Sequence, residues 1–305
     1  MATTILKHRV SLKQTLRNYT DLMKLRIVTL LVFTCVTAMV VAGNGIPPVD
    51  ILLPTILGGI FAAGGASALN QYYDRDMDVR MQRTARRPIP SGRISPTNAL
   101  LFGAGMVAWS VLVLGVFVNW LAATLALIGA IYYVGLYTAV LKRNTVANIV
   151  IGGGAGAMPV LVGWAAVANS LSLEAFILFA IVFYWTPPHS WALAILVNKD
   201  YAAANVPMMP VARGEAVTRE QILLYSIQLF LITLIPGLAL LLPDIGFLGA
   251  FYVISALVLG GGLVYMAAKL IRRADKPTAR SVYKYSSAYL ALLFLAMIFD
   301  RIVFL

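Results

Sequence analysis

Long apolar runs alternate with short polar segments along the whole chain. Nine of these runs are long enough to cross the hydrocarbon core of a bilayer, which takes about 20 residues in a helix. We expect spans at residues 27–43, 51–72, 98–118, 121–140, 146–168, 173–196, 222–242, 246–268 and 284–304. The pattern therefore predicts an all-α polytopic membrane protein with nine transmembrane helices.

Lysine and arginine gather in every second segment between these runs. All but one of the 24 lie in residues 1–26, 75–97, 142–143, 199–219 and 269–284, and Arg301 is the exception. The intervening connections, around residues 44–50, 119–120, 169–172 and 243–245, contain none. Short cytoplasmic loops carry the excess of basic residues, so we expect a cytoplasmic amino terminus and, after nine crossings, an outside carboxyl terminus. We expect no removable signal peptide, because the basic amino-terminal segment lacks an early apolar core.

The composition narrows the chemistry. Charged residues make up 12% of the chain, whereas a soluble domain carries about a quarter. The net charge of +12 follows from the orientation pattern, so we expect membrane lipid and no nucleic acid as a partner. Cys35 is the sole cysteine, which excludes disulfides within the chain, thiolate zinc sites and iron–sulfur clusters. Of the two histidines, His8 lies in the amino-terminal tail and His189 stands alone near the membrane, so we expect no bis-histidine haem cofactor of the electron-transfer kind within one chain.

The polar connections indicate a single transmembrane domain over residues 1–305, without a separate soluble domain. The longest connections are residues 73–97 and 198–221, both on the predicted cytoplasmic side. Residues 1–26 form a cytoplasmic amino-terminal segment. In it, Leu12, Leu16, Tyr19 and Met23 recur at helical spacing, which suits a short helix on an anionic leaflet, although a solvated tail is an equal alternative.

The second expected span ends in an acidic ladder. Asn70, Asp74 and Asp78 are spaced by four residues, which places them on one face of a helix, about 6 Å apart along its axis. Asp76 points elsewhere. Mg²⁺ prefers one or two carboxylates together with phosphate oxygens and water, so the ladder predicts a magnesium–diphosphate site. The alternative is that these acids balance the neighbouring arginines at a membrane surface.

A second acidic position favours the metal site. Asp200 follows the sixth expected span on the same side of the membrane, within Asn198-Lys199-Asp200-Tyr201, and can face the ladder. Two acidic poles could each hold Mg²⁺ on one diphosphate. Bases at this level that could bind phosphate oxygens are Arg80, Arg83, Arg86, Arg87, Lys142 and Arg143.

The ladder and the residues after it resemble the first signature of the UbiA-type intramembrane prenyltransferases. The matching motifs are NxxxDxxxD at residues 70–78 and RTARRPIPSG at residues 83–92. The resemblance implies a UbiA-type bundle of nine helices in a bacterial cytoplasmic (inner) membrane. It also implies that Mg²⁺ ionises a prenyl diphosphate. On this interpretation Asn70, Asp74, Asp78 and Asp200 bind the metal, while Asn198, Lys199 and Tyr201 join the bases around the substrate.

Further segments resemble the haem-modifying branch of that superfamily, the protoheme IX farnesyltransferases or haem O synthases. They are residues 137–164, TPPHSWALAILVNKDY at 186–201 and VPMMP at 206–210. Many relatives carry a second DxxxD ladder, whereas this chain has Asp200 with Asn198 nearby. The resemblance implies farnesyl diphosphate as donor and haem B as substrate. It further implies that a haem vinyl group attacks the farnesyl cation and that water adds, so that the expected product is haem O. Haem-pathway membrane enzymes are possible partners.

Two further residues are candidates with structural alternatives. His189 could ligate or orient the haem, or assist a proton transfer, and the alternative is a histidine hydrogen-bonded within the bundle. Asn148 lies in the fifth expected span, where a buried amide needs a partner.

Three other functions are weighed. The same chemistry on an aromatic quinone precursor is the nearest rival, and product analysis distinguishes it. The glycine-containing pattern of the CDP-alcohol phosphotransferases is missing from residues 70–93. A secondary transporter would place ionisable residues near the bilayer midplane, whereas this chain gathers its acids at one surface.

Overall fold

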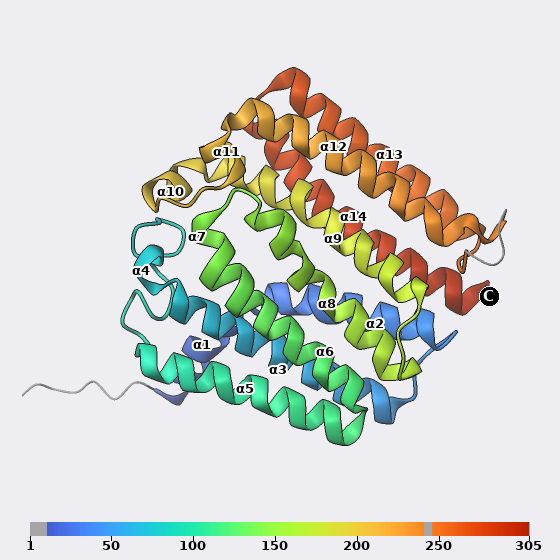
Figure 1. The fold of residues 1–305 in the computed structure, drawn as a ribbon, viewed down its shortest axis with the longest axis horizontal. Coiled ribbons are helices and arrows are strands. Elements are labelled where there is room, and N and C mark those ends of the chain that lie inside the picture. Colours follow the sequence, from blue (N-terminus) through green and yellow to red (C-terminus); the bar gives the residue numbers. More distant parts are fainter. Residues whose placement is uncertain (1–10, 241–245, 305) are drawn as a thin grey trace, which may run out of the picture.

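The computed structural model describes residues 11–240 and 246–304, and this part of the chain is built of helices (Figure 1). His8 and the connection at 243–245 lie outside the described residues. Nine helices are long and apolar enough to cross a membrane, so the described chain is a multi-pass membrane protein as the sequence predicts. They are α2 (Leu25–Ala42), α3 (Val49–Tyr73), α5 (Pro96–Phe117), α6 (Trp120–Ile131) with its continuation to Asn144, α8 (Asn148–Ala168), α9 (Leu173–Leu196), α12 (Gly214–Leu234), α13 (Ala250–Arg273) and α14 (Lys276–Val303).

Two of these helices begin well before the expected spans. α12 begins at Gly214 and α14 at Lys276, not at residues 222 and 284. The beginnings follow from local backbone chemistry. The Asp275 carboxylate accepts a hydrogen bond of 2.7 Å from the Thr278 backbone nitrogen and so caps α14. Gly214 has a φ of 84°, which lets the chain turn into α12. Both helices therefore extend beyond the most apolar part of their sequence.

The short helices lie at one end of the bundle. They are α1 (Leu12–Met23), α4 (Arg75–Asp78), α7 (Lys142–Asn144), α10 (Asn198–Ala203) and α11 (Met209–Ala212). Figure 1 shows α4, α7, α10 and α11 gathered at the end opposite the carboxyl terminus. Both long polar connections are therefore brought to the same end of the molecule.

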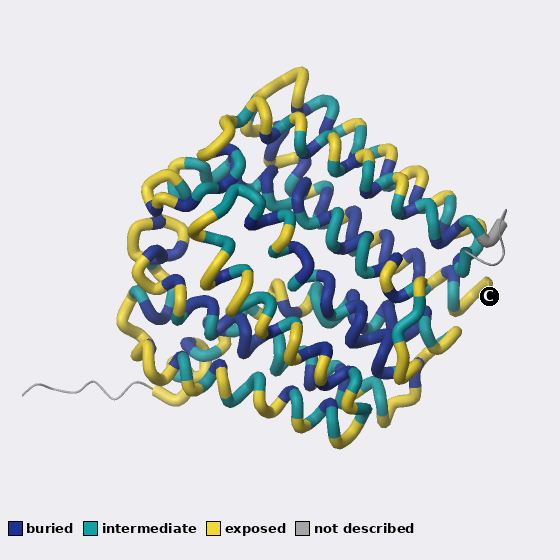
Figure 2. Tube along the Cα trace, in the orientation of Figure 1, coloured by how far each residue is buried: buried dark blue, intermediate teal, exposed yellow. Residues whose placement is uncertain are grey.

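The core of the bundle is centred on α8, which packs against α2, α6 and α9. It is the most buried of the nine long helices, and the tube along α8 is largely dark blue in Figure 2. Gly163 of α8 lies directly against the Cys35 carbonyl of α2, where a Cβ atom would overlap the backbone. Large apolar side chains such as Trp109, Ile254 and Val258 stay exposed on the outer helices, where a bilayer would cover them.

The opposite end of the bundle is held by Asp300 and Arg301 of α14. Asp300 is fully buried and accepts hydrogen bonds from the backbone nitrogens of Gly249 (2.6 Å) and Tyr252 (3.0 Å), at the start of α13. Arg301 donates to the Phe247 carbonyl at 2.9 Å and to the side chain of Asn44. The one base outside the predicted cytoplasmic segments therefore ties two connections to the last helix.

Candidate active site

The acidic ladder of Asn70, Asp74 and Asp78 crosses a break between two helices and keeps its helical register. α3 ends at Tyr73 and α4 begins at Arg75, with Asp74 between them. The backbone nevertheless keeps its i→i−4 bonds through the junction: Asp74 N donates to Asn70 O at 2.9 Å, and Asp78 N donates to Asp74 O at 2.8 Å. The side chains of the buried row, Asn70, Asp74 and Asp78, are consequently all enclosed, at 3%, 0% and 1% exposure.

Asp76 lies outside this row. Its carboxylate accepts two hydrogen bonds from the Arg143 guanidinium, at 2.7 and 2.8 Å, and both side chains are exposed. The hydrogen bonds from Arg143 lower the pKa of Asp76 to about 2. Arg143, expected to contact phosphate, also donates to the Tyr73 carbonyl at 2.9 Å. It belongs to a surface pair and makes no hydrogen bond or ion pair with the side chains of the buried row in the described structure.

Two bases pair with the buried acids. Lys142 Nζ lies 2.5 Å from Asp74 Oδ2, and Arg87 donates to both oxygens of Asp78, at 2.7 and 2.8 Å. A buried carboxylate is tolerated when an opposite charge and hydrogen bonds compensate it. Lys142 and Arg87 reach the row from different segments, so the site is assembled by tertiary contacts among α3, α4, α7 and the loop after α4.

The remaining oxygen of Asp74 distinguishes this row from a closed ion pair. Asp74 Oδ1 is buried and has no hydrogen-bond partner among the described residues. A carboxylate oxygen left in this way is an available ligand for a cation. No group of three or more His, Cys, Asp or Glu residues in the described chain could hold a metal by itself. The donors therefore fit an oxygen-loving ion that takes its other ligands from phosphate and water, as Mg²⁺ does.

Asp200 lies at the same end of the bundle as the buried row. It lies on α10, and its Oδ2 accepts a hydrogen bond of 3.3 Å from the Arg83 backbone nitrogen, so it contacts the arginine-rich loop rather than Asp74 or Asp78 directly. Burial raises the pKa of the adjacent Tyr201. The charges of Arg83 and Arg87 act in the opposite direction, and the charge of Asp74 raises the pKa further. The acidic positions of α4 and α10 are thus brought to one region.

The other predicted substrate residues divide into exposed and inward groups. Arg80, Arg83, Arg86 and Lys199 are exposed. Asn198 donates to Glu215 over a long 3.5 Å and keeps its oxygen buried without a partner in the described chain. Asn148 is fully buried at the start of α8, donates to the Thr145 carbonyl at 2.7 Å, and likewise has a buried oxygen without a described partner.

His189 occupies a separate aromatic setting on α9. Its ring lies between Trp185 and Tyr283, with centroid distances of 4.4 and 4.7 Å, and its Nδ1 lies 2.9 Å from Ser286 Oγ. Ser286 Oγ also donates to the Tyr283 carbonyl at 2.9 Å. When that hydroxyl proton is so used, Nδ1 must carry the imidazole proton and Nε2 keeps its lone pair. The surroundings thus favour one tautomer.

Two site residues escaped the sequence interpretation. Lys24, between α1 and α2, donates to Asn70 Oδ1 at 2.9 Å, although the sequence shows it only as one base of the amino-terminal segment. Burial, followed by the nearby charges of Arg87 and Lys142, lowers the pKa of Lys24 well below its usual value. Thr138 accepts from Asn70 Nδ2 at 3.1 Å. It lies in a π-helical segment, η1 (Tyr132–Leu141), and such segments often occur at functional sites.

Comparison with known proteins identifies the family. The model of the UbiA prenyltransferase family matches residues 31–297. The chain belongs to the UbiA prenyltransferase family. A protoheme IX farnesyltransferase of Roseiflexus castenholzii is 49% identical over 304 residues, which cover 99% of this chain and 55% of the relative. Another, of Gloeothece citriformis, is 45% identical over 303 residues, with 99% of this chain and 92% of the relative covered. The chain thus spans about half the length of the Roseiflexus relative.

Solved structures share the UbiA fold. A digeranylgeranylglyceryl phosphate synthase structure aligns with a TM-score of 0.77 at 18% identity, over 94% of this chain and 99% of that one. A UbiA homolog from Archaeoglobus fulgidus bound to DMAPP and Mg²⁺ aligns with a TM-score of 0.63 at 15% identity, over 92% and 99%. At these identities the likeness concerns the arrangement of helices, which confirms the predicted UbiA-type bundle.

Proposed function

We propose that this chain transfers a farnesyl group from farnesyl diphosphate to a vinyl group of haem B, with addition of water, to give haem O and diphosphate. The observation that carries the proposal is the buried row with its free Asp74 oxygen, set among bases at one end of a membrane bundle. The acceptor follows from the relatives, since several that are 45–49% identical are named protoheme IX farnesyltransferase.

The diphosphate end of the substrate would lie against the buried row. Asp74 and Asp78 would hold Mg²⁺, with Asp200 of α10 as the second acidic pole. The Archaeoglobus fulgidus homolog with bound DMAPP and Mg²⁺ supports a metal in this fold. When bound, Mg²⁺ supplies positive charge that stabilises the departing diphosphate. Arg87 and Lys142 would bind phosphate oxygens, with Arg80, Arg83, Arg86 and Lys199 at the exposed edge.

The transfer breaks the allylic C–O bond, the π bond of the vinyl group and one O–H bond of water, and it forms a C–C bond and a C–O bond. The allylic C–O bond of farnesyl diphosphate breaks with its electron pair on the diphosphate. The haem vinyl group then attacks the farnesyl carbon, and the positive charge moves to the carbon beside the porphyrin ring. Water adds there and releases a proton, which gives a hydroxyethylfarnesyl substituent. The apolar bundle would keep water from the first cation until the vinyl group has reacted.

His189 is the candidate contact for haem. Its position between Trp185 and Tyr283 holds the ring, and the bond to Ser286 favours a free Nε2 lone pair. A neutral imidazole with a fixed Nδ1–H is the usual form of a histidine that ligates a metal. We therefore propose that His189 ligates or orients the iron of the haem substrate. We also propose that Asn148 contacts the substrate through its buried oxygen.

The site end is proposed to face the cytoplasm of a bacterium, with the carboxyl terminus on the outside of the cytoplasmic membrane. The donor would then reach the buried row from the cytoplasmic leaflet. Membrane enzymes that supply haem B or consume haem O would be the expected partners. One transmembrane domain would carry the whole reaction.

The deciding experiment offers purified protein farnesyl diphosphate and Mg²⁺ with either haem B or an aromatic quinone precursor, and analyses the products by mass. Farnesylated, hydrated haem supports the proposal. Prenylated aromatic product without modified haem would reassign the acceptor. Solute flux across sealed vesicles, without release of diphosphate, would instead indicate a transporter.

A further inference from the structure

Lys24 contacts the buried row from a different segment of the chain. It joins α1 to α2 in a left-handed backbone conformation, with φ 52° and ψ 54°, which is uncommon for a residue with a Cβ atom. Its ammonium group donates to Asn70 Oδ1 at 2.9 Å. The turn thus brings Lys24 Nζ to the first residue of the buried row.

The contacts around Asn70 fix which way its amide points. The Asp74 carboxylate only accepts hydrogen bonds, so the Asn70 atom that faces it must be the nitrogen, and the Asn70 oxygen then faces Lys24. On the other side, Asn70 Nδ2 donates to Asp74 Oδ2 at 2.9 Å and to Thr138 Oγ1 at 3.1 Å. Thr138 Oγ1 gives its own proton to the Tyr133 carbonyl at 2.8 Å, so it accepts from Asn70. The network is consistent with a single orientation of the amide.

This orientation leaves the Asn70 oxygen engaged. Asp74 Oδ2 receives hydrogen bonds from Asn70 and Lys142, whereas Asp74 Oδ1 receives none from the described residues. We propose that Lys24 is a positioning residue, which holds Asn70 as a hydrogen-bond donor to Asp74. Asp74 then presents its free oxygen to the cation. This inference rests on the metal–diphosphate site of the proposed function. Asn70 then acts on the cation through Asp74.

Helix α1 holds Lys24 in place. The Leu22 carbonyl accepts hydrogen bonds from Ser67 Oγ and Gln71 Nε2 of α3, both at 2.9 Å, and the Leu22 side chain is fully buried. Arg93 donates to the side chains of Asn18 and Asp21, at 2.9 and 2.7 Å. These contacts dock the end of α1 on the face of α3 that leads into the buried row.

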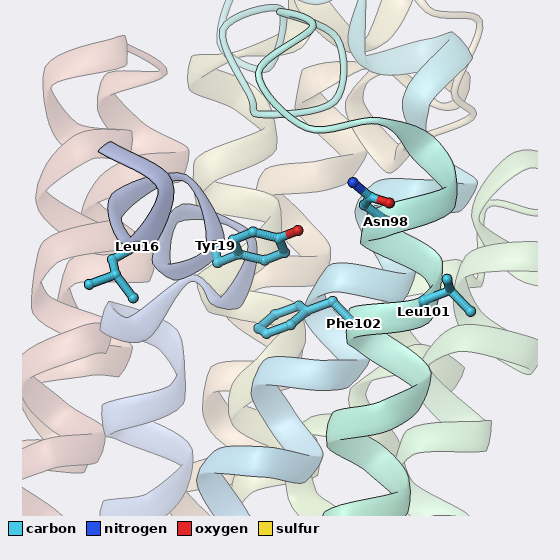
Figure 3. A pocket seen from close by; sticks show the side chains of 5 residues that line it. All are labelled: Leu16, Tyr19, Asn98, Leu101 and Phe102. Carbon is cyan, nitrogen blue, oxygen red and sulfur yellow. The ribbon is translucent and has the colours of Figure 1, made fainter. Parts of the chain in front are cut away.

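A second contact fixes the other side of α1. The rings of Tyr19 on α1 and Phe102 on α5 lie 4.8 Å apart, at the floor of a groove that Leu16, Asn98 and Leu101 also line (Figure 3). Leu12 and Leu16 remain largely exposed on the free face of α1. The helix is thus held between α3 and α5, so the position of Lys24 is set by packing as well as by its own hydrogen bond.

The test compares Lys24→Met with Arg26→Met, a matched loss of an exposed base two residues further along. Mn²⁺ in place of Mg²⁺ is titrated into each purified protein with an unreactive farnesyl diphosphate analogue, and free Mn²⁺ is read by electron paramagnetic resonance. A hydrogen bond to a charged group is typically worth enough for about a tenfold change in an equilibrium constant, so Lys24→Met should weaken Mn²⁺ binding about tenfold. Arg26→Met should bind as wild type, and Lys24→Arg should recover part of the loss.

A double variant separates positioning from general damage. If Lys24 acts through Asn70, Lys24→Met should cost little further Mn²⁺ affinity when added to Asn70→Ala. Additive losses, or unchanged Mn²⁺ binding in folded Lys24→Met, would overturn the inference. Should Lys24→Met fail to fold, Lys24→Gln, which keeps a donor, takes its place with the same expectations at smaller size. A wild-type protein that binds Mn²⁺ but leaves haem B unchanged would end the proposed function and leave the role of Lys24 standing.

Discussion

Replacement of Asp74 by asparagine removes one negative charge from the middle of the buried row and keeps the size of the side chain. Asp74 is fully buried, pairs with Lys142 at 2.5 Å, and carries the free oxygen. If this carboxylate holds the charge that draws diphosphate away, its loss acts mainly in the transition state. Preorganised electrostatic groups of this kind contribute about 3 kcal/mol, which corresponds to a loss of turnover of roughly a hundredfold.

The same replacement also affects stability. Lys142 loses its anionic partner, and breaking a fully buried pair costs about 3–5 kcal/mol. Because the Lys142 side chain retains 13% exposure, it can turn toward water and the cost should be smaller. We therefore expect a lower melting temperature in detergent. Haem O formation must be measured at saturating Mg²⁺ and expressed per folded protein.

Asp76→Asn is the matched control. Asp76 is 58% exposed and pairs with Arg143 at the surface, where an ion pair contributes about 0–1 kcal/mol. Its turnover should stay near that of the wild type. Equal damage from Asp76→Asn, or near-normal turnover from folded Asp74→Asn, would show that the row only balances charge at a membrane surface.

Three further predictions follow from the site and the topology. Asp78→Asn and Asp200→Asn should each lower haem O formation and combine with Asp74→Asn less than additively, because groups that act as a unit lose function together; additive losses in the double variants would contradict this. His189→Ala should keep binding of farnesyl diphosphate and lose haem affinity or turnover, measured by haem titration; normal haem modification would return His189 to a structural role. Reporters fused after residues 90, 142, 210 and 277 should report a cytoplasmic location, and those after 46, 170 and 244 a location outside. A reversed result at 90 or 210 would contradict a site shared by the connections 73–97 and 198–221.

The bundle could be predicted because its signals are local. Each of the nine long helices follows from an apolar run of bilayer length. The spacing of the buried row survives the break at Asp74, since the backbone bonds from Asp74 and Asp78 keep the same register. The residues at which helices begin are harder to predict from the apolar pattern, because the cap at Asp275 and the turn at Gly214 depend on single residues.

The partners of the buried row have no local signal. Lys24 is far from Asn70 in sequence, and only the docking of α1 on α3 brings their side chains together. Thr138 is presented by a π-helical segment, which the apolar pattern does not distinguish from an ordinary helix. Similarly, spacing places Asn70 on the face of Asp74 but cannot tell whether its oxygen or its nitrogen faces Asp74.

The most direct test of the central claim is the amount of haem O formed per diphosphate released while Mg²⁺ is titrated against a chelator. The account predicts one haem O for each diphosphate, with both products lost together when Mg²⁺ is removed and restored together when it returns. Haem that stays unmodified at saturating Mg²⁺, or haem O that forms equally well without a divalent ion, would contradict it.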